Sequence, residues 1–444
     1  MNNTTTTVFM QRLATLAAAT ALAGCVSTAG IAPVAQPVTA EKFGLSTDAA
    51  PQILADWWDA LNDHALSAMI GCALEGNPSL RVAKLRIDRA EASVAGAQAA
   101  GGLQVNADAS ATRQKFSANS IYPAPLGGST QTMANAQLGA SWEFDFFGKN
   151  RAALDAALGT ARAAQADAAA ARSVLATQVA RQYVQLARLV ELRAIAVRTL
   201  EQRDQTLGLI RQRVQSGLDT NVELRQGEQS LPEARRQIEQ IDEQIALTHN
   251  ALSALTAQPV DTYASLTPAL PALMRSSLVD VPANVPADLL GRRADIVAAK
   301  WRIEAATGDV ASTKAQFYPN INLTAFAGLA SIGLNRLIDT GSGQWGVGPA
   351  IHLPIFDAGR LRANLRGKTT DLDIAVETYN GAVIEAIHDV ADQLASLRSI
   401  ERQQRQENES LAAAESAYDL AQQRFRAGLA TYLTVLTTES TVLG

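Results

Sequence analysis

Aromatic side chains make up only 5% of the 444 residues, and charged side chains only 18%. Bulky rings usually fill the interior of a globular domain, so a compact core of ordinary composition is not expected. Alanine is abundant instead, and this residue favours helix and lets neighbouring helices approach closely. The chain is also longer than one ordinary compact core. The composition therefore predicts long, closely packed helices.

The sequence also lacks the usual signs of an enzyme or a nucleic-acid-binding protein. A net charge of −5 gives no electrostatic support for a nucleic-acid partner. The four histidines are scattered without metal-ligand spacing, and no glycine-rich phosphate loop is present. Carboxylates lie beside Arg or Lys, as in "RIDRAEA", where solvated ion pairs are the ordinary explanation. We therefore expect no catalytic residues, no metal and no cofactor.

Only two cysteines occur, and the first ends an amino-terminal apolar run that is too short to span a bilayer. The run closes with "LAGC", which resembles a bacterial lipoprotein signal. This pattern predicts a signal peptide over 1–24, lipidation of Cys25 and a lipidated linker over 25–59. The alternative is a plain signal peptide cleaved near Ala23. An Asp directly after the cysteine would resemble an inner-membrane retention signal. Val26 stands there instead, which favours the outer membrane.

The second cysteine, Cys72, lies in "LSAMIGCALEG", where we expect a buried and inert thiol. Beyond Cys25 no uninterrupted apolar run reaches about 18 residues, so no membrane-spanning helix is expected.

The chain contains two copies of one unit. Gly217 and Gly428 are 211 residues apart, as are Gly148 and Gly359, and "LRVAKLRIDRA" at 80–90 aligns with "IVAAKWRIEAA" at 296–306. We predict repeat 1 over 60–256, a linker over 257–282 and repeat 2 over 283–444. Helical sequence continues for about 38 residues after Gly217, but only 16 residues follow Gly428. The last helix of repeat 2 is therefore expected to be truncated or naturally short.

Each repeat carries two stretches of alternating apolar and polar residues, at about 103–114 and 133–146 and at about 319–329 and 344–356. Alternation over about ten residues is typical of a membrane β-strand, although a soluble amphipathic sheet is the alternative for any single strand. Four strands cannot close a barrel, because about eight is the smallest number that can. An open edge in lipid would leave backbone groups unpaired. The barrel must then be shared, with eight strands from two chains or twelve from three.

A very long helix is predicted after each strand pair. The first runs from Gly148 to near Gly217, and about 66 residues at 1.5 Å each give roughly 100 Å. Leu186, Leu200 and Leu207 recur at multiples of seven, which indicates supercoiled packing. The glycines in "RVQSGLDTN" and "RFRAGLATY" suit the left-handed position that ends a helix. We therefore expect two helical hairpins whose tips lie far from the strands.

Several motifs together resemble the TolC-type outer-membrane efflux channels, and most closely their lipoprotein (NodT-like) branch that serves RND efflux systems. They are "LAGC", "SWEFDFFGKNRAA", "RRADIVAAKWRIEAA", "FYPNINL", "LPIFDAGRLRANL" and the paired "RxxxGL" turns. The resemblance implies an α+β membrane protein in which a homotrimer forms a 12-stranded outer-membrane β-barrel, continued by a coiled-coil helical barrel into the periplasm. It also implies a periplasmic adaptor (membrane fusion protein) and an inner-membrane RND-type pump as partners.

The implied function is an exit duct that passively conducts small toxic compounds to the exterior. The alternatives are the outlet of type I protein secretion and a structural coiled-coil envelope lipoprotein that would need no alternating strands.

The resemblance also implies two groups of functional residues. The periplasmic aperture would contain Glu223, Phe425, Thr434 and Thr437, and the tips that contact the adaptor would contain Arg213, Gly217, Leu218, Arg424, Gly428 and Leu429. Coiled-coil packing is the alternative for Phe425, and helix capping for the tips. Two positions depart from the family pattern, which usually has Pro at Ala294 and Asp at Thr437. A weaker negative ring at Thr437 predicts altered gating or a lower preference for cations.

Overall fold

The computed structural model describes residues 27–39, 56–119, 121–268 and 291–444. These residues form two compact units. Unit 1 contains 27–39, 84–167 and 293–383, and unit 2 contains 56–83, 168–268, 291–292 and 384–444. Each unit takes residues from both repeats: unit 1 holds all four strands, and unit 2 holds both glycine turns. The signal peptide, Cys25 and most of the predicted linker after repeat 1 lie outside the described residues.

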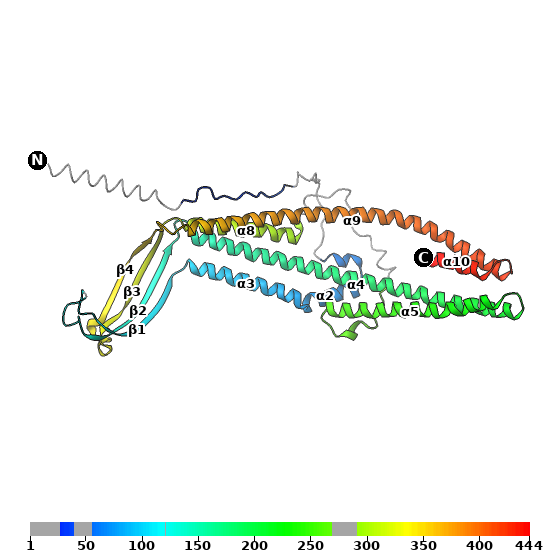
Figure 1. The fold of residues 1–444 in the computed structure, drawn as a ribbon, viewed down its shortest axis with the longest axis horizontal. Helices are drawn as coiled ribbons and strands as arrows, with labels where there is room; N and C mark the ends of the chain where they lie inside the picture. Colours follow the sequence, from blue (N-terminus) through cyan, green and yellow to red (C-terminus); the bar gives the residue numbers. More distant parts are fainter. Residues whose placement is uncertain (1–26, 40–55, 120, 269–290) are drawn as a thin grey trace. The chain divides into compact units, whose positions relative to one another are not determined.

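The sheet of unit 1 has four antiparallel strands in the order β1-β2-β3-β4 (Figure 1). They are β1 (Gln104–Lys115), β2 (Thr130–Phe144), β3 (Asn320–Ile332) and β4 (Gly343–His352). All four predicted strands are present, with shifted ends. β2 stops before Asp145 because that carboxylate accepts the first backbone N–H groups of the next helix. β4 ends at His352, before the predicted end at 356, because its partner β3 begins at Asn320, the residue opposite His352.

The strand register gives the sheet one apolar and one polar face. Leu138 lies opposite both Ala107 and Ala327, and Ala325 lies opposite Val347. On the other face, Gln137 pairs with Asp108 and Glu143 with Asn322. Neighbouring strands therefore present residues of the same character to the same side, as the alternation predicted. β1 and β4 form the two edges of the sheet.

Two helices of equal length follow the strand pairs. α4 (Lys149–Gln215) and α9 (Arg360–Arg426) each contain 67 residues. The first residues of the two helices are 211 positions apart, and so are their last residues. Each begins after a glycine in the left-handed region, Gly148 with φ +75° and Gly359 with φ +87°. An acceptor carboxylate also precedes each helix: Asp145 before α4 and Asp357 before α9. The predicted duplication is thus confirmed, and it includes the glycine and the carboxylate that precede each long helix.

Unit 1 packs α8 (Ala294–Ala315) against the beginning of α9 (Figure 1). The described part of the amino-terminal segment joins this core through Ile31, which is 8% exposed. Backbone N–H groups of Val34 and Ala35 donate to Asp373 Oδ1 at 2.8 and 2.9 Å. Asn380 accepts from the backbone of Val38 at 2.8 Å and donates to the carbonyl of Gln36 at 3.0 Å. Side chains of α9 therefore hold the segment 27–39, which we call the strap.

Unit 2 contains α2 (His64–Gly76), α5 (Asn221–Leu255) and α10 (Tyr432–Leu443), together with the later parts of α4 and α9. α3 (Pro78–Ala100) begins in this unit and continues in unit 1. Tyr183 is buried in the main core, and its hydroxyl donates to Asp63 at 2.8 Å. Asp63 also accepts the first N–H groups of α2. Burial, followed by the bond to Asp63, raises the pKa of Tyr183.

The prediction of a buried thiol at Cys72 is wrong for the chain as described, because this residue is exposed. The face of α2 that packs inward contains Leu66, Met69, Ile70 and Ala73, at helical spacing. Cys72 lies two residues beyond Ile70 and therefore on the other side of the helix.

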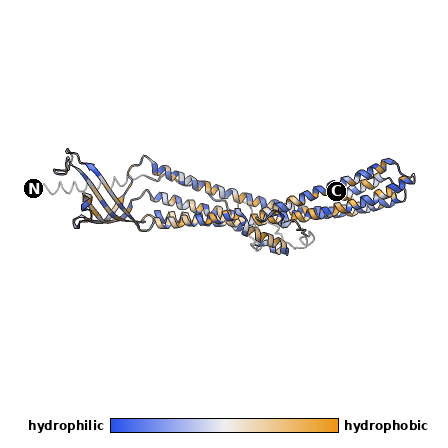
Figure 2. Ribbon diagram, turned by 90° about the horizontal axis from the view of Figure 1, so that it is seen from below, coloured by the Kyte–Doolittle hydropathy of each residue, from blue (hydrophilic) through white to orange (hydrophobic). Residues whose placement is uncertain are grey.

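Within the described residues, no helix is both long enough and apolar enough to cross a membrane. Figure 2 shows polar and apolar residues interspersed along the long helices.

Candidate functional site

The two glycine turns of unit 2 share one geometry. Gly217 has φ +70° and Gly428 has φ +77°, a region that favours glycine. In the first turn the amide of Leu218 donates to the carbonyl of Arg213 at 2.8 Å, and the amide of Gly217 to Val214 at 3.0 Å. The second turn repeats both bonds at the same distances. Each long helix thus ends in a Schellman motif, which explains why the sequence repeats this short stretch.

Arg213 joins the two turns. Its Nε and Nη2 donate to the two carboxylate oxygens of Asp219 at 2.7 and 3.0 Å. Its Nη1 donates to the backbone carbonyl of Phe425 at 3.1 Å, and its guanidinium carbon lies 4.9 Å from the centre of the Phe425 ring. Only 12% of the Arg213 side chain is exposed. One residue therefore connects the end of α4 to the end of α9.

Behind this arginine the two hairpins share an apolar cluster. Ile210, Phe425, Tyr432 and Val435 are all buried, and the rings of Phe425 and Tyr432 are 6.0 Å apart. Phe425 therefore packs in the core of its own chain. Its predicted part in closing an entrance remains a prediction.

The predicted acidic residue Glu223 lies in the first turn of α5 and closes a capping box with Thr220. Its carboxylate accepts the backbone N–H of Thr220 at 3.0 Å and also the Thr220 hydroxyl. The hydroxyl bond is the main cause that lowers the pKa of Glu223, so the group remains ionised.

Thr434 and Thr437 lie on exposed positions of α10. The Thr437 hydroxyl donates to the carbonyl of Leu433 in its own helix at 2.9 Å. The Thr434 hydroxyl lies 3.3 Å from that of Thr431. Thr437 thus presents a small uncharged group where the resemblance implies an Asp, and Thr434 lies one turn before it.

A buried ion pair, not foreseen from the sequence, holds α10 to α4. Arg203 Nε lies 3.2 Å from Glu439 Oε2, and Arg203 Nη1 donates to the carbonyl of Ser230 in α5 at 3.3 Å. Glu439 is 5% exposed, and burial raises the pKa of its carboxyl although Arg203 lowers it. Glu439 itself lines a cavity of about 320 Å³, together with Gln202, Glu415, Tyr418, Asp419, Val442 and Leu443.

The remaining predicted tip residues face outward. Leu218 is 67% exposed and Leu429 is 69% exposed, and Arg424 is also exposed. Arg213 differs from these three because its guanidinium points inward. A sequence signal for this difference exists, since Asp219 follows Arg213 while Ala430 takes the equivalent place after Arg424.

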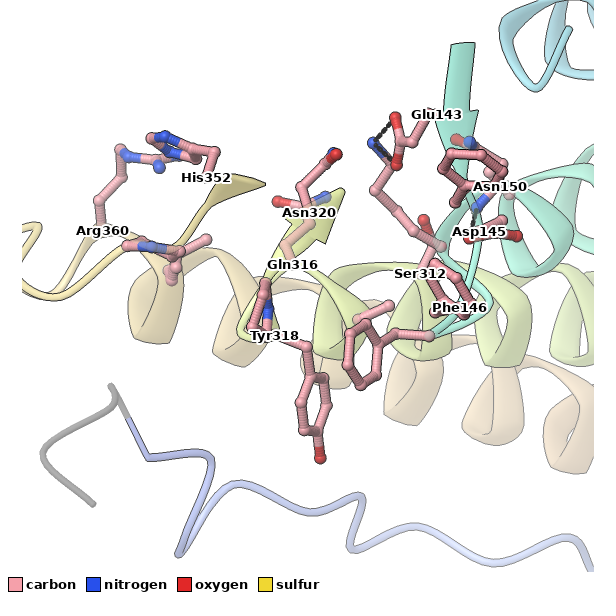
Figure 3. Close-up of a pocket in the computed structure, with 18 residues that line it drawn as sticks. Glu143, Asp145, Phe146, Asn150, Ser312, Gln316, Tyr318, Asn320, His352 and Arg360 are labelled. Atoms are coloured by element: carbon pink, nitrogen blue, oxygen red, sulfur yellow. Dashed lines mark hydrogen bonds and ion pairs between the residues drawn. The ribbon is translucent and has the colours of Figure 1, made fainter. Parts of the chain in front are cut away.

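A second candidate site lies in unit 1, where the polar face of the sheet meets the helices (Figure 3). This cavity measures about 390 Å³, and Glu143, Asn320 and His352 line it from the polar face. Lys149 pairs with Glu143 at 2.7 Å. Among the described residues, the buried Asn320 Oδ1 and Asn150 Nδ2 find no hydrogen-bond partner. The cavity is therefore polar and suited to water or a polar solute.

Comparison with known proteins agrees with this architecture. The model of the family described as "Outer membrane efflux protein" matches residues 69–258 and 285–444. The chain belongs to this family. It is 36% identical over 362 residues to the fusaric acid resistance protein FusA of Burkholderia cepacia, covering 80% of this chain and 68% of FusA. It is 32% identical over 403 residues to the multidrug resistance outer membrane protein MdtP of Escherichia coli K12, covering 89% and 81%.

Among solved structures, the outer membrane protein VceC of Vibrio cholerae has a TM-score of 0.80 and 34% identity, and the alignment covers 88% of this chain and 93% of VceC. The predicted fold class is thereby confirmed, and this outer membrane efflux protein is a channel of the outer membrane. Channels of this family are homotrimers that work with periplasmic adaptors and inner-membrane RND-type pumps. The family is a transport family rather than an enzyme family.

Proposed function

We propose that this efflux channel is a passive exit duct, and that each chain supplies four of the twelve strands that close it. The observation that supports this proposal is the two-faced sheet with an edge at β1 and another at β4. In lipid, the N–H and C=O groups along both edges need partners, and identical chains can supply them. The polar face then lines the duct, and the apolar face contacts lipid.

The cargo we infer is small toxic compounds rather than secreted proteins. The relatives FusA and MdtP are named for fusaric acid resistance and multidrug resistance, which favours efflux over type I protein secretion. A structural tether would share the long helices but would not need the two-faced sheet.

Two measurements test this function. The purified protein should be a trimer in detergent and should conduct ions in planar bilayers, whereas a tether would give no conductance. Deleting the gene should raise sensitivity to toxic compounds. Loss of a secreted protein with unchanged sensitivity would instead support a secretion outlet.

We also infer that the apolar cluster and α10 form the periplasmic gate. Phe425, held by Arg213, would keep the ends of the hairpins together, and Glu223, Thr434 and Thr437 would line the aperture. Thr437 in place of the usual Asp makes a weaker negative ring, so a lower preference for cations is expected. Thr437→Asp should raise the cation-to-anion permeability ratio in single-channel recordings, and an unchanged ratio would reject this role.

The exposed ends of the turns are the surface that we propose for the adaptor. Leu218 and Leu429 offer apolar side chains beside backbone that the Schellman bonds hold in place. Leu218→Arg together with Leu429→Arg should abolish cross-linking to the adaptor in cells and leave the trimer intact. Cross-linking at the wild-type level would exclude this surface.

Lipidation at Cys25 is proposed from the "LAGC" pattern. The strap supports it indirectly, because Arg362, two residues after the start of α9, donates to the carbonyls of Ser27 and Ala29. The chain just after Cys25 is therefore fixed near the end of the sheet. Mass spectrometry of the mature amino terminus tests this directly: an unmodified terminus would refute lipidation.

A further inference from the structure

Phe326 does not fit the pattern of the polar face. It lies in the middle of β3, and the strand register places it opposite Gly139 of β2 and Gly346 of β4. The other residues on this face of the four described strands are mostly polar or small, and none of them carries a phenyl, phenol or indole ring. Phe326 is 43% exposed. The four described strands therefore present one phenyl ring on a polar surface.

The ring lies along the sheet and not away from it. A Cβ atom added to Gly346 would be 2.6 Å from Cε1 and 2.9 Å from Cζ of Phe326. The ring thus occupies the place where a side chain of residue 346 would be, and it covers the β4 backbone there. Glycine at 346 is what allows this position, because any larger residue would push the ring off the wall.

We propose that Phe326 is a contact residue of the conduction path, which offers an aromatic surface to the aromatic or apolar parts of passing solutes. Gly346 keeps the ring flat against the wall, so the path stays wide at this level. The proposal rests on the proposed function, since the polar face lines a duct only when copies of the chain close the sheet. A trimer would carry three such rings at one level.

A weak contact suits this place. A solute in a duct must leave again, so conduction requires binding that is favourable but not tight. Contact between aromatic rings is worth roughly a two- to tenfold change in an equilibrium or a rate. The ring would favour aromatic solutes by about this factor over polar solutes of similar size.

The test measures how fast thiol reagents added outside intact cells pass the ring, so it does not depend on the periplasmic gate. Cys72→Ser provides the background, because Cys72 is exposed. Asn322→Cys places a thiol on the polar face four residues from Phe326, on the helix side. Ala330→Cys places the matched control four residues away on the side of the β1–β2 and β3–β4 connections. The reagents are a maleimide with an anionic polycyclic dye and a polar, non-aromatic maleimide of similar size.

Phe326→Ala should slow labelling of the Asn322→Cys thiol by the aromatic reagent roughly two- to tenfold. Labelling by the polar reagent, and all labelling of the Ala330→Cys thiol, should not change. An unchanged rate with the aromatic reagent would overturn the proposal. The ring would then only cover the glycine backbone, and Phe326→Ala would change only the temperature at which the trimer dissociates.

Gly346→Leu supplies the second arm. It should lower the rate at which both reagents label the Asn322→Cys thiol, because the leucine side chain would displace the Phe326 ring from the wall into the conduction path. Adding Phe326→Ala to Gly346→Leu should restore the rate at which the polar reagent labels the Asn322→Cys thiol. If the double variant were labelled as slowly as Gly346→Leu alone, the role of Gly346 would be overturned. If neither reagent reaches either thiol while the heat-resistant trimer is present, the polar face does not line an open duct. That result would contradict the proposed function itself.

Discussion

At the scale of single residues, the equivalent arginines of the two turns do different things. Arg213 is folded inward onto Asp219 and Phe425, whereas Arg424 is exposed. The cause is one substitution between the repeats, because Ala430 replaces the carboxylate that Asp219 supplies. The duplicated turn has thus kept its backbone geometry while only one copy binds the two helix ends together.

Arg213→Ala should therefore loosen the turns, because Asp219 would lose its partner while largely buried. The loss of such a charge-assisted bond costs about 1–3 kcal/mol, or roughly a 5- to 150-fold greater population of the locally open state. Hydrogen exchange of the amides of residues 216–220 measures this opening. Arg424→Ala is the matched control and should leave exchange near Gly428 almost unchanged. Equal effects of the two substitutions would show that the contacts of Arg213 add nothing.

Glu439 predicts a dependence on pH. Burial raises the pKa of its carboxyl above the ordinary value, so the folded state binds a proton more tightly than the unfolded state. Its contribution to stability is complete below the ordinary pKa of 4.5 and is lost as pH rises through the raised value. Arg203 faces Glu439 from α4, and the phenols of Tyr418 and Tyr432 have pKa values raised by burial, so they stay neutral in this range.

Protection of the α10 amides, corrected for intrinsic exchange, should therefore fall as the pH rises above 4.5 and passes through the raised pKa of Glu439. Glu439→Gln keeps an acceptor for Arg203 and should abolish this change. The same fall in the Gln variant would assign the effect to another group.

At the scale of elements, the sequence predicted most of what local rules determine. Alternation located all four strands, and the repeated glycines located the ends of two helices of 67 residues. Features that depend on register could not be predicted in this way. The position of the Phe326 ring depends on Gly346, which lies opposite it on the neighbouring strand, and the sequence alone does not give this pairing. The exposure of Cys72 likewise depends on which face of α2 packs against the core. Both faces of that helix are apolar enough to pack there, so the sequence alone does not decide between them.

Helix α4 and helix α8 cross so closely in unit 1 that their backbones touch. A Cβ atom added to Gly308 would lie 2.8 Å from the backbone nitrogen of Ala156 and 2.9 Å from the carbonyl oxygen of Ala152. Gly159 faces Ala305 in the same way, at 2.8 Å from its nitrogen. Backbone cannot move aside as a flexible side chain can, so these two glycines set the spacing of the pair.

Gly308→Ala should destabilise unit 1 by about 1–3 kcal/mol, because overpacking forces the helices apart. Gly367→Ala in α9 is the control, since a Cβ atom there meets nothing within 4 Å. The control should stabilise the protein by about 0.5–1 kcal/mol through helix propensity. Thermal denaturation in detergent should shift in opposite directions for the two variants. A shift of the same sign would mean that the crossing can relax.

At the scale of the whole molecule, the apolar face of the sheet decides whether the chain functions in a membrane. The face is continuous across all four strands, and its side chains are well exposed in the single chain, with Val347 and Trp345 at 65% and 77%. In water such an exposed apolar surface would promote aggregation. In lipid it contributes to stability, and only the two strand edges then remain to be satisfied by neighbouring copies.

Adjacent residues of β3 separate the two faces in one experiment. Ala325 lies on the apolar face opposite Ala140 and Val347, and Thr324 lies on the polar face opposite Ser141 and Gly348. An arginine on the lipid face costs about 2–4 kcal/mol per chain near the centre of the bilayer, and much less where water is present. Ala325→Arg should therefore sharply reduce the heat-resistant trimer recovered from outer membranes, whereas Thr324→Arg should leave it near the wild-type level. Thr324→Arg also gives up one exposed bond to the Gly348 carbonyl, so a small loss in the control is expected. If Thr324→Arg proved the more damaging of the two, the polar face would be the buried one, and the assignment of lumen and lipid sides would have to be reversed.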